Sequence, residues 1–134
     1  TFMIAGQECT RGCRFCAVDT IRNPPPPEED EPAKLADAIQ RMGLTYSVIT
    51  VVNRDDLEDG GASHYKKCID TVHEKCPYVG LELLCSDLSG NVKALESLLI
   101  KTTKIYCMAW KSSATASCGT GHTYLGQHPF PDPV

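Results

Sequence analysis

Three cysteines lie close together near the start of the sequence. Cys9, Cys13 and Cys16 have the spacing C-x-x-x-C-x-x-C within the stretch ECTRGCRFCA. Thiolates bind zinc and iron–sulfur clusters, and Gly12, which has no Cβ, lets the backbone approach a bound group closely. A [4Fe–4S] cluster usually takes four thiolates, so a loop with three would leave one iron open to bind a small molecule. The spacing therefore suits an incomplete iron–sulfur site.

Other kinds of cysteine chemistry are also open. The sequence has eight cysteines, an even count that would suit disulfides in a secreted chain, but its charged, helix-bearing middle does not need them to build a core. Structural zinc normally takes four ligands, and no second cysteine pair of matching spacing follows the first. His64 with Cys68, and His73 with Cys76, are about one helical turn apart, a spacing found in ordinary helix residues as well as in zinc ligands.

Strand and helix patterns alternate around these residues. Apolar and β-branched runs predict strands, and helical periodicity between them predicts helices. A proline at the first helical position and a glycine after the last apolar residue mark the two ends of the first helix. We expect strands at residues 2–5, 46–52, 79–84 and 104–109, and helices at residues 32–43, 62–75 and 92–100.

The same patterns predict the buried side of each helix and the class of the fold. Strands alternating with helices indicate an α/β fold with a parallel sheet, either open or curved into a (β/α) barrel. Three to four βα units cannot close an eight-stranded barrel, so we expect an incomplete barrel and an irregular tail. The residues expected to face the core are Leu35, Ala36, Ile39 and Met42 in the first helix and Tyr65, Ile69 and Val72 in the second.

Polar loops follow the first three predicted strands. The cysteine loop follows the first strand, residues 53–61 follow the second and residues 85–91 follow the third. Because the carboxyl ends of parallel strands share one end of the sheet, we expect these loops to meet. Glu82 lies inside the third, otherwise apolar strand, where a buried and unpaired carboxylate would be costly, so we expect a cationic partner for it.

Composition limits the classes of partner. The net charge of -4 gives no basic surface for nucleic acid, and no apolar run approaches the roughly 20 residues that span a membrane. We therefore expect neither a nucleic acid nor a membrane partner. The pattern degrades after the last helix into small residues, glycines and prolines. We expect a core domain at residues 1–101 and a divergent, poorly ordered tail at residues 102–134.

The cysteine motif after a first strand resembles that of the radical S-adenosylmethionine enzymes. The strings CTRGCRFC, RNPPPP, EP, NRDD, DGG and LEL narrow the resemblance to the lipoyl synthase family, over about residues 1–100. The resemblance implies a partial radical-SAM barrel in which Cys9, Cys13 and Cys16 hold a [4Fe–4S] cluster, and S-adenosylmethionine binds the open iron. In the family, a 5′-deoxyadenosyl radical then removes hydrogens from two carbons of a protein-bound octanoyl chain, and two sulfurs from an auxiliary cluster are inserted.

The resemblance also implies where the cofactor lies. Phe15 is expected beside the adenine, with core packing as the alternative interpretation. Thr50, Asn53 and Arg54, at the end of the second strand, are expected to face the cofactor, as is Glu82 in the third strand. The implied partners are octanoylated lipoyl-carrier domains, namely the H protein and 2-oxoacid dehydrogenase E2 domains, and a reductant protein such as ferredoxin. The implied location is the mitochondrion in eukaryotes, or the cytoplasm if the chain is bacterial.

Two further segments have both a structural and a functional interpretation. Asp55 and Asp56 would contact ribose or the carrier, or form a solvated acidic loop. The proline run at residues 24–27 is typical of a stiff spacer, here between the cysteine loop and the first helix, with a docking role as the alternative.

The sequence also departs from the family pattern. The family's second cysteine set, C-x-x-x-x-C-x-x-x-x-x-C, and its Arg-Ser-Ser-Tyr motif have no counterpart here, so the auxiliary cluster is not supported. Asp19 replaces a usual lysine, Ser86 a proline and Leu88 a phenylalanine. We therefore expect a chain that is incomplete or inactive alone. The alternatives are a non-catalytic truncated product of a lipoyl synthase gene and a small zinc-binding module.

Overall fold

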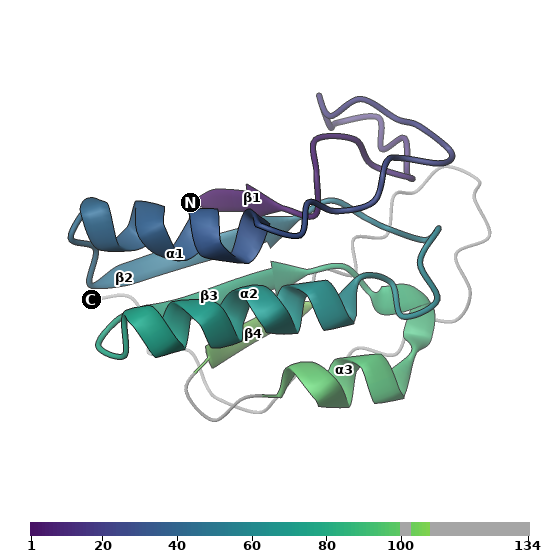
Figure 1. The fold of residues 1–134 in the computed structure, drawn as a ribbon. Coiled ribbons are helices and arrows are strands. Elements are labelled where there is room, and N and C mark those ends of the chain that lie inside the picture. Colours follow the sequence, from purple (N-terminus) through teal and green to yellow (C-terminus); the bar gives the residue numbers. More distant parts are fainter. Residues whose placement is uncertain (100–102, 108–134) are drawn as a thin grey trace, which may run out of the picture.

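A computed structural model describes residues 1–99 and 103–107 of the chain. Four parallel strands form one sheet, and three helices pack on it (Figure 1). Within the described residues, no helix combines the length and the apolar character needed to cross a membrane. In chain order the elements are β1 (Phe2–Ile4), α1 (Glu31–Arg41), β2 (Tyr46–Val51), α2 (Ala62–Lys75), β3 (Gly80–Cys85), the short 3₁₀ helix η1 (Leu88–Gly90), α3 (Val92–Leu98) and β4 (Thr103–Cys107).

The strands lie side by side in the order in which they occur along the chain. β1 pairs with β2, β2 with β3 and β3 with β4, all in parallel. Right-handed crossovers that always step in the same direction place every connecting helix on one face of the sheet. Figure 1 shows α1, α2 and α3 on the same side, and α2 packs against both of its neighbours. The predicted α/β class and parallel sheet are confirmed.

The two faces of this sheet differ sharply in burial. Side chains alternate along a strand, so every second residue of β2 and β3 faces the helices. Ile49, Leu81 and Leu83 do so and are at most 1% exposed. The intervening residues point to the opposite face, which no described helix covers. Those with intermediate or larger exposure on that face are Met3, Tyr46, Val48, Thr50, Glu82 and Leu84.

Most of the predicted elements agree with the structure to within a few residues. α2 has the predicted bounds, and Tyr65, Ile69 and Val72 are all fully buried, as predicted. The prediction that Met42 faces the core is wrong, because α1 ends at Arg41 and Met42, as its C-cap residue, is 65% exposed. β4 begins at Thr103, within the region predicted as tail, whereas residues 108–134 lie outside the described part.

The Asp-Gly-Gly motif makes the turn that starts α2. Gly61 has a left-handed φ of 91°, and a Cβ there would lie 2.8 Å from the ring of Tyr65. The carboxylate of Asp59 accepts hydrogen bonds from the backbone amides of Gly61 and Ser63, at 2.9 and 2.7 Å, and so satisfies free donors at the start of the helix. This turn fixes the direction in which the chain leaves the loop after β2.

Candidate functional site

The cysteine loop lies at the end of the sheet where the strands terminate. Figure 1 shows the purple and dark blue segment between β1 and α1 at this end, on the side where the loop between β2 and α2 also lies. Side-chain contacts join the loops that follow β1, β2 and β3, and the expectation that these three loops meet is confirmed. The residue that joins all three is Arg11, between the first and second cysteines.

The Arg11 guanidinium bridges two carboxylates from different loops. Its Nε and Nη2 donate to Asp55 at 2.7 and 2.6 Å, and its Nη2 also donates to Asp87 at 2.8 Å. The hydrogen bonds with Asp55 are the main cause of a raised pKa of Arg11, and they hold the pKa of Asp55 below its usual value. Ser89 donates to the same Asp55 carboxylate at 3.0 Å. Asp55 is therefore an exposed residue whose carboxylate is also a structural partner of the cysteine loop.

Cys9 is the buried member of the three cysteines, at 9% exposure. Its Sγ accepts hydrogen bonds from the backbone amides of Arg11 and Asn53, at 3.4 and 3.3 Å. Its own amide donates to the Asp19 carbonyl, and its carbonyl accepts from the Ile21 amide. Amide donors around a ligating sulfur tune a bound iron–sulfur cluster. The position and polarity of this sulfur suit a metal ligand.

Cys13 and Cys16 are exposed, and a turn with a 3.0 Å hydrogen bond from the Cys16 amide to the Cys13 carbonyl joins them. Phe15 lies within this turn and is 67% exposed, so the interpretation that it packs in the core is wrong. All three cysteines carry free thiols. The loop therefore presents two accessible thiols beside one that is already enclosed.

Thr50 and Glu82 lie on the uncovered face of the sheet. The Thr50 hydroxyl donates to the Phe2 carbonyl at 3.2 Å. Glu82 is only partly buried, and it accepts a hydrogen bond from the Tyr46 hydroxyl. The backbone register sets it beside Lys104 of β4. Two of the residues expected to face a cofactor thus share this face.

Arg54 does not lie on this face, and its side chain contacts Ala5, just after the end of β1. Its side chain is 1% exposed, and its Nε and Nη2 each donate to Asp56 at 2.8 Å. Its Nη1 donates to the Ala5 carbonyl at 3.0 Å. The hydrogen bonds between Arg54 and Asp56 are the main cause of a raised pKa of Arg54 and a lowered pKa of Asp56. The structure therefore does not bring Arg54 together with Thr50 and Glu82.

A second polar cluster links α1 and α2. The Glu31 Oε2 accepts from the Ala5 amide at 2.9 Å and lies 2.5 Å from the His64 Nε2, which is 3.7 Å from the Cys68 Sγ. Burial alone would raise the pKa of Glu31, but hydrogen bonds from His64 and Ala5 more than offset it, and the pKa is lowered. Burial raises the pKa of the Cys68 thiol to about 12. The three ligand atoms lie within 4.8 Å of one another, so the cluster is also a possible metal site.

Sequence reasoning missed the part of Glu31 in this cluster. The favourable interaction of a carboxylate with a helix N-terminus already explains a glutamate at the start of a helix, so the sequence gives no separate signal for this contact. The spacing of His64 and Cys68 was visible in the sequence, but the approach of a third side chain from a different helix was not.

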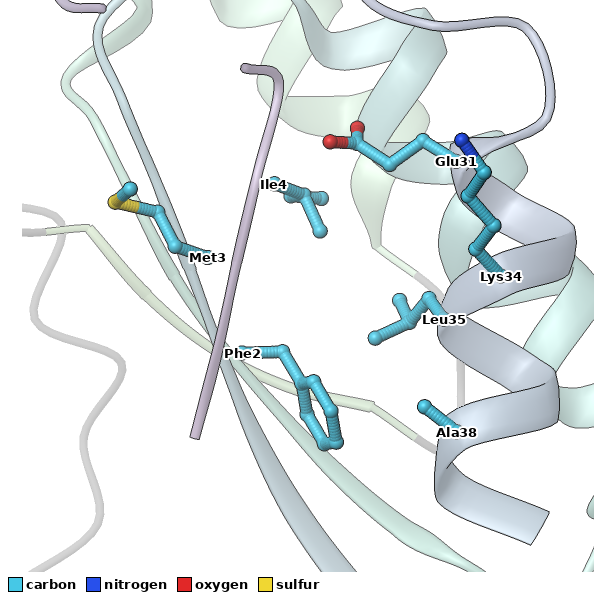
Figure 2. Close-up of a pocket in the computed structure, with 7 residues that line it drawn as sticks. All are labelled: Phe2, Met3, Ile4, Glu31, Lys34, Leu35 and Ala38. Carbon is cyan, nitrogen blue, oxygen red and sulfur yellow. The ribbon is translucent and has the colours of Figure 1, made fainter. Parts of the chain in front are cut away.

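A hollow of about 200 Å³ lies between β1 and α1 (Figure 2). The side chains of Phe2, Ile4 and Leu35 point into it, with Glu31 and Lys34 near its upper end. None of the three clustered cysteines lines it. Within the described residues, this hollow and the cysteine loop are therefore separate features.

The sequence of the chain is similar to those of known lipoyl synthases. No protein-family model matches the chain. Over 106 residues, 79% of this chain, it is 48% identical to lipoyl synthase 2, mitochondrial, of Trypanosoma cruzi, and 50% identical to lipoyl synthase, mitochondrial, of Leishmania braziliensis. Over the same length it is 47% identical to lipoyl synthase of Chlamydia trachomatis. The matches cover 25%, 28% and 34% of these relatives, so the chain spans about a quarter to a third of their length.

Proposed function

Because the chain is homologous to one part of the lipoyl synthases, we propose that it is the part that binds a [4Fe–4S] cluster and S-adenosylmethionine. The observation that carries this proposal is the cysteine loop, with one enclosed sulfur and two accessible ones at the carboxyl ends of parallel strands. In parallel α/β folds this end carries the reactive groups. The proposed cluster ligands are Cys9, Cys13 and Cys16.

The chemistry of the donor set fits an iron–sulfur cluster. Cys9 already accepts two backbone N–H groups at its sulfur, as a thiolate ligand would. Cys13 and Cys16 are exposed and free, so a bound group could reach both without displacing core residues. Three thiolates on one loop would leave one iron for the cofactor. When bound, the cluster supplies the electron that splits S-adenosylmethionine.

The chain's own residues would position the two partners. Arg11 ties the cysteine loop to Asp55 and Asp87, and so holds Cys9 against the loop after β2. Thr50 and Glu82 present polar atoms on the uncovered face, on which we place the cofactor. Phe15 is exposed beside the third cysteine, where an aromatic ring suits the adenine. We place Asn53 at the boundary between the cysteine loop and this face, because its backbone amide donates to the Cys9 Sγ.

The larger assembly belongs to the same proposal. The strands lie in the sheet in their order along the chain, and all the helices lie on one face. This arrangement suits a segment of a (β/α) barrel, whose interior would be the uncovered face. We infer that the whole protein inserts two sulfurs into the octanoyl chain of a lipoyl-carrier domain, and that this chain supplies the radical-forming part. A reductant such as ferredoxin and a mitochondrial location follow from the same relationship, since several relatives are named mitochondrial.

The proposal is tested by anaerobic reconstitution of the 134-residue chain with iron and sulfide. We expect about four irons per chain and, under strong reductant with S-adenosylmethionine, formation of 5′-deoxyadenosine. The matched control is Cys76→Ala, which removes a buried thiol outside both the loop and the Glu31–His64–Cys68 cluster and should leave both results unchanged. One zinc per chain in place of iron, or iron that survives the change of all three loop cysteines to Ala, would overturn the proposal.

A further inference from the structure

Ala5 is the point at which the chain leaves β1 and turns into the cysteine loop. It is fully buried and has a φ of 73°, a left-handed conformation that is unfavourable for a residue with a Cβ. Gly6 follows with a φ of 103°, which only glycine adopts readily. Two consecutive residues with positive φ therefore set the direction of the loop four residues before Cys9.

Charged side chains hold both polar groups of Ala5. Its amide donates to the Glu31 Oε2 at 2.9 Å, and its carbonyl accepts from the Arg54 Nη1 at 3.0 Å. Glu31 is the first residue of α1 and Arg54 lies in the loop after β2, so the two contacts come from different parts of the chain. Together they fix the orientation of the peptide groups on either side of the strained residue.

Each of these charged groups has a partner of its own. His64 from α2 contacts Glu31, and the side chains of the two are 13% and 19% exposed. Asp56 contacts Arg54, and their side chains are 15% and 1% exposed. A largely buried charge needs such a partner, because an unpaired one would be costly. The partners therefore keep both groups charged and correctly aimed at the backbone.

The alternative for the Glu31 side of the cluster is a metal ion bound by Glu31, His64 and Cys68. Two hydrogen bonds, with Ala5 and with His64, engage the Glu31 Oε2. A metal would have to displace the contact with Ala5 or share the oxygen with it, and it would have to deprotonate a fully buried thiol. The hydrogen bonds account for the positions of Glu31 and His64, so we favour a role in holding the backbone.

We propose that Glu31 and Arg54 act as positioning residues that clamp Ala5, with His64 and Asp56 as their supports, and thereby aim the cysteine loop at its cluster. A residue other than glycine keeps a left-handed conformation only where surrounding contacts hold it there, and the contacts of Glu31 and Arg54 do so for Ala5. Removing one contact should let the peptide rotate and move Cys9 relative to Cys13 and Cys16. This inference rests on the proposed function of the loop as a cluster site.

The test compares Glu31→Ala with Glu28→Ala in the reconstituted chain. Glu28 is an exposed carboxylate three residues earlier, and its partner is the exposed Lys34, so it is a matched control. We expect Glu31→Ala to release iron to a chelator about tenfold faster than the wild type, and Glu28→Ala to match the wild type. Glu31→Gln, which keeps an acceptor for the Ala5 amide, should restore most of the lost retention.

A second comparison separates positioning from general stability. Ile69→Val removes a methyl group from a fully buried site on α2 and should lower the melting temperature without touching Ala5. Its iron release should stay near that of the wild type. The clamp would be overturned if Glu31→Ala released iron no faster than Glu28→Ala. It would also be overturned if Glu31→Ala released iron no faster than Ile69→Val at an equal loss of stability.

The outcome for the clamp can be told apart from the outcome for the proposed function. If the wild type binds no iron, the function fails, and amide hydrogen exchange of the metal-free chain still tests the clamp. We expect the Ala5 amide to exchange at least tenfold faster in Glu31→Ala than in Glu28→Ala, and equal rates would contradict the clamp. One zinc per chain that Glu31→Ala, His64→Gln and Cys68→Ala each abolish would replace it with a metal site.

Discussion

The two halves of the cysteine loop differ in how firmly the rest of the molecule holds them. In the first half, Cys9 is enclosed and its sulfur accepts two amides, and Arg11 joins the loops after β2 and β3. In the second half, Cys13, Phe15 and Cys16 are all exposed, around a single turn. One half is enclosed and hydrogen-bonded to its surroundings, and the other is accessible.

This difference suggests a division of work between the halves. A site holds its ligand more tightly when part of it is pre-formed, because less conformational entropy is lost on binding. The first half of the loop would supply that fixed part, with Cys9 as its sulfur. The exposed half would complete the coordination and leave room for a cofactor. Substitutions in the two halves should therefore have separable effects on folding and on metal binding.

The largest effect is expected from the cysteines themselves. Cys13→Ala and Cys16→Ala should each abolish most iron binding but change the free energy of unfolding of the metal-free chain by no more than about 0.5 kcal/mol, because both side chains are exposed. Cys9→Ala should abolish iron binding and also cost about 1 kcal/mol, because it removes a buried acceptor of two amides. Iron analysis and urea unfolding check both. Equal stability losses at all three positions would break the comparison.

The next largest effect is expected at the support of Arg54. Asp56→Asn leaves a guanidinium that is 1% exposed without its carboxylate, and it should lower the free energy of unfolding by about 3 kcal/mol. Glu58→Gln, a nearby exposed acidic residue, serves as the control and should change it by less than about 0.5 kcal/mol. Urea unfolding of the metal-free chain gives both values. A loss of the same size in both variants would show that Asp56 is not a specific support.

The same pair predicts a pH dependence. Because Arg54 lowers the pKa of Asp56 in the folded chain, the stabilisation is fully present above the unfolded value of about 3.9 and is lost as the pH falls through the lower folded pKa. The stability difference between the wild type and Asp56→Asn should therefore be constant near neutral pH and shrink as the pH falls below about 3.9. Urea midpoints measured across this range test it. A difference that grew towards low pH would contradict the sign.

A smaller effect is expected for the partly exposed ion pair of Arg11 in the first half of the loop. Arg11→Lys removes the two-pronged contact with Asp55 but keeps one positive charge, and the side chains of the pair are 29% and 35% exposed. Solvent screening limits the expected loss to about 0.5–1 kcal/mol, which added salt should reduce further. Unfolding at low and high salt gives the two values. A loss that did not depend on salt would mean that Arg11 acts through packing alone.

Sequence patterns predicted the framework of this fold better than the details of its site. The apolar period of α2 and the β-branched run of β2 depend on local chemistry, and both elements lie where they were predicted. Met42 was misplaced because a helix can end one residue before its apolar stripe does. The three loops were predicted to meet from the parallel order of the strands alone, but the residue that joins them was not.

The site's polar contacts connect residues that are far apart in the sequence. Arg54 was expected at the cofactor because it follows the second strand, yet it is buried against the Ala5 carbonyl, 49 positions away. Glu31 reaches the Ala5 amide over 26 positions and His64 over 33. No periodicity or spacing encodes such contacts, since they depend on how α1 and α2 pack. The cysteines could be proposed as ligands from the sequence because their chemistry and spacing lie within one short segment.

The most direct test is a Mössbauer spectrum of the chain reconstituted with ⁵⁷Fe, recorded with and without S-adenosylmethionine. The account predicts one cluster of about four irons, in which one iron lacks a cysteine ligand and changes its signal when the cofactor is added. The same spectrum of Cys76→Ala should be unchanged, because its buried thiol lies outside the loop and outside the Glu31–His64–Cys68 cluster. Four irons that do not respond to the cofactor, or a chain without a cluster, would contradict the account.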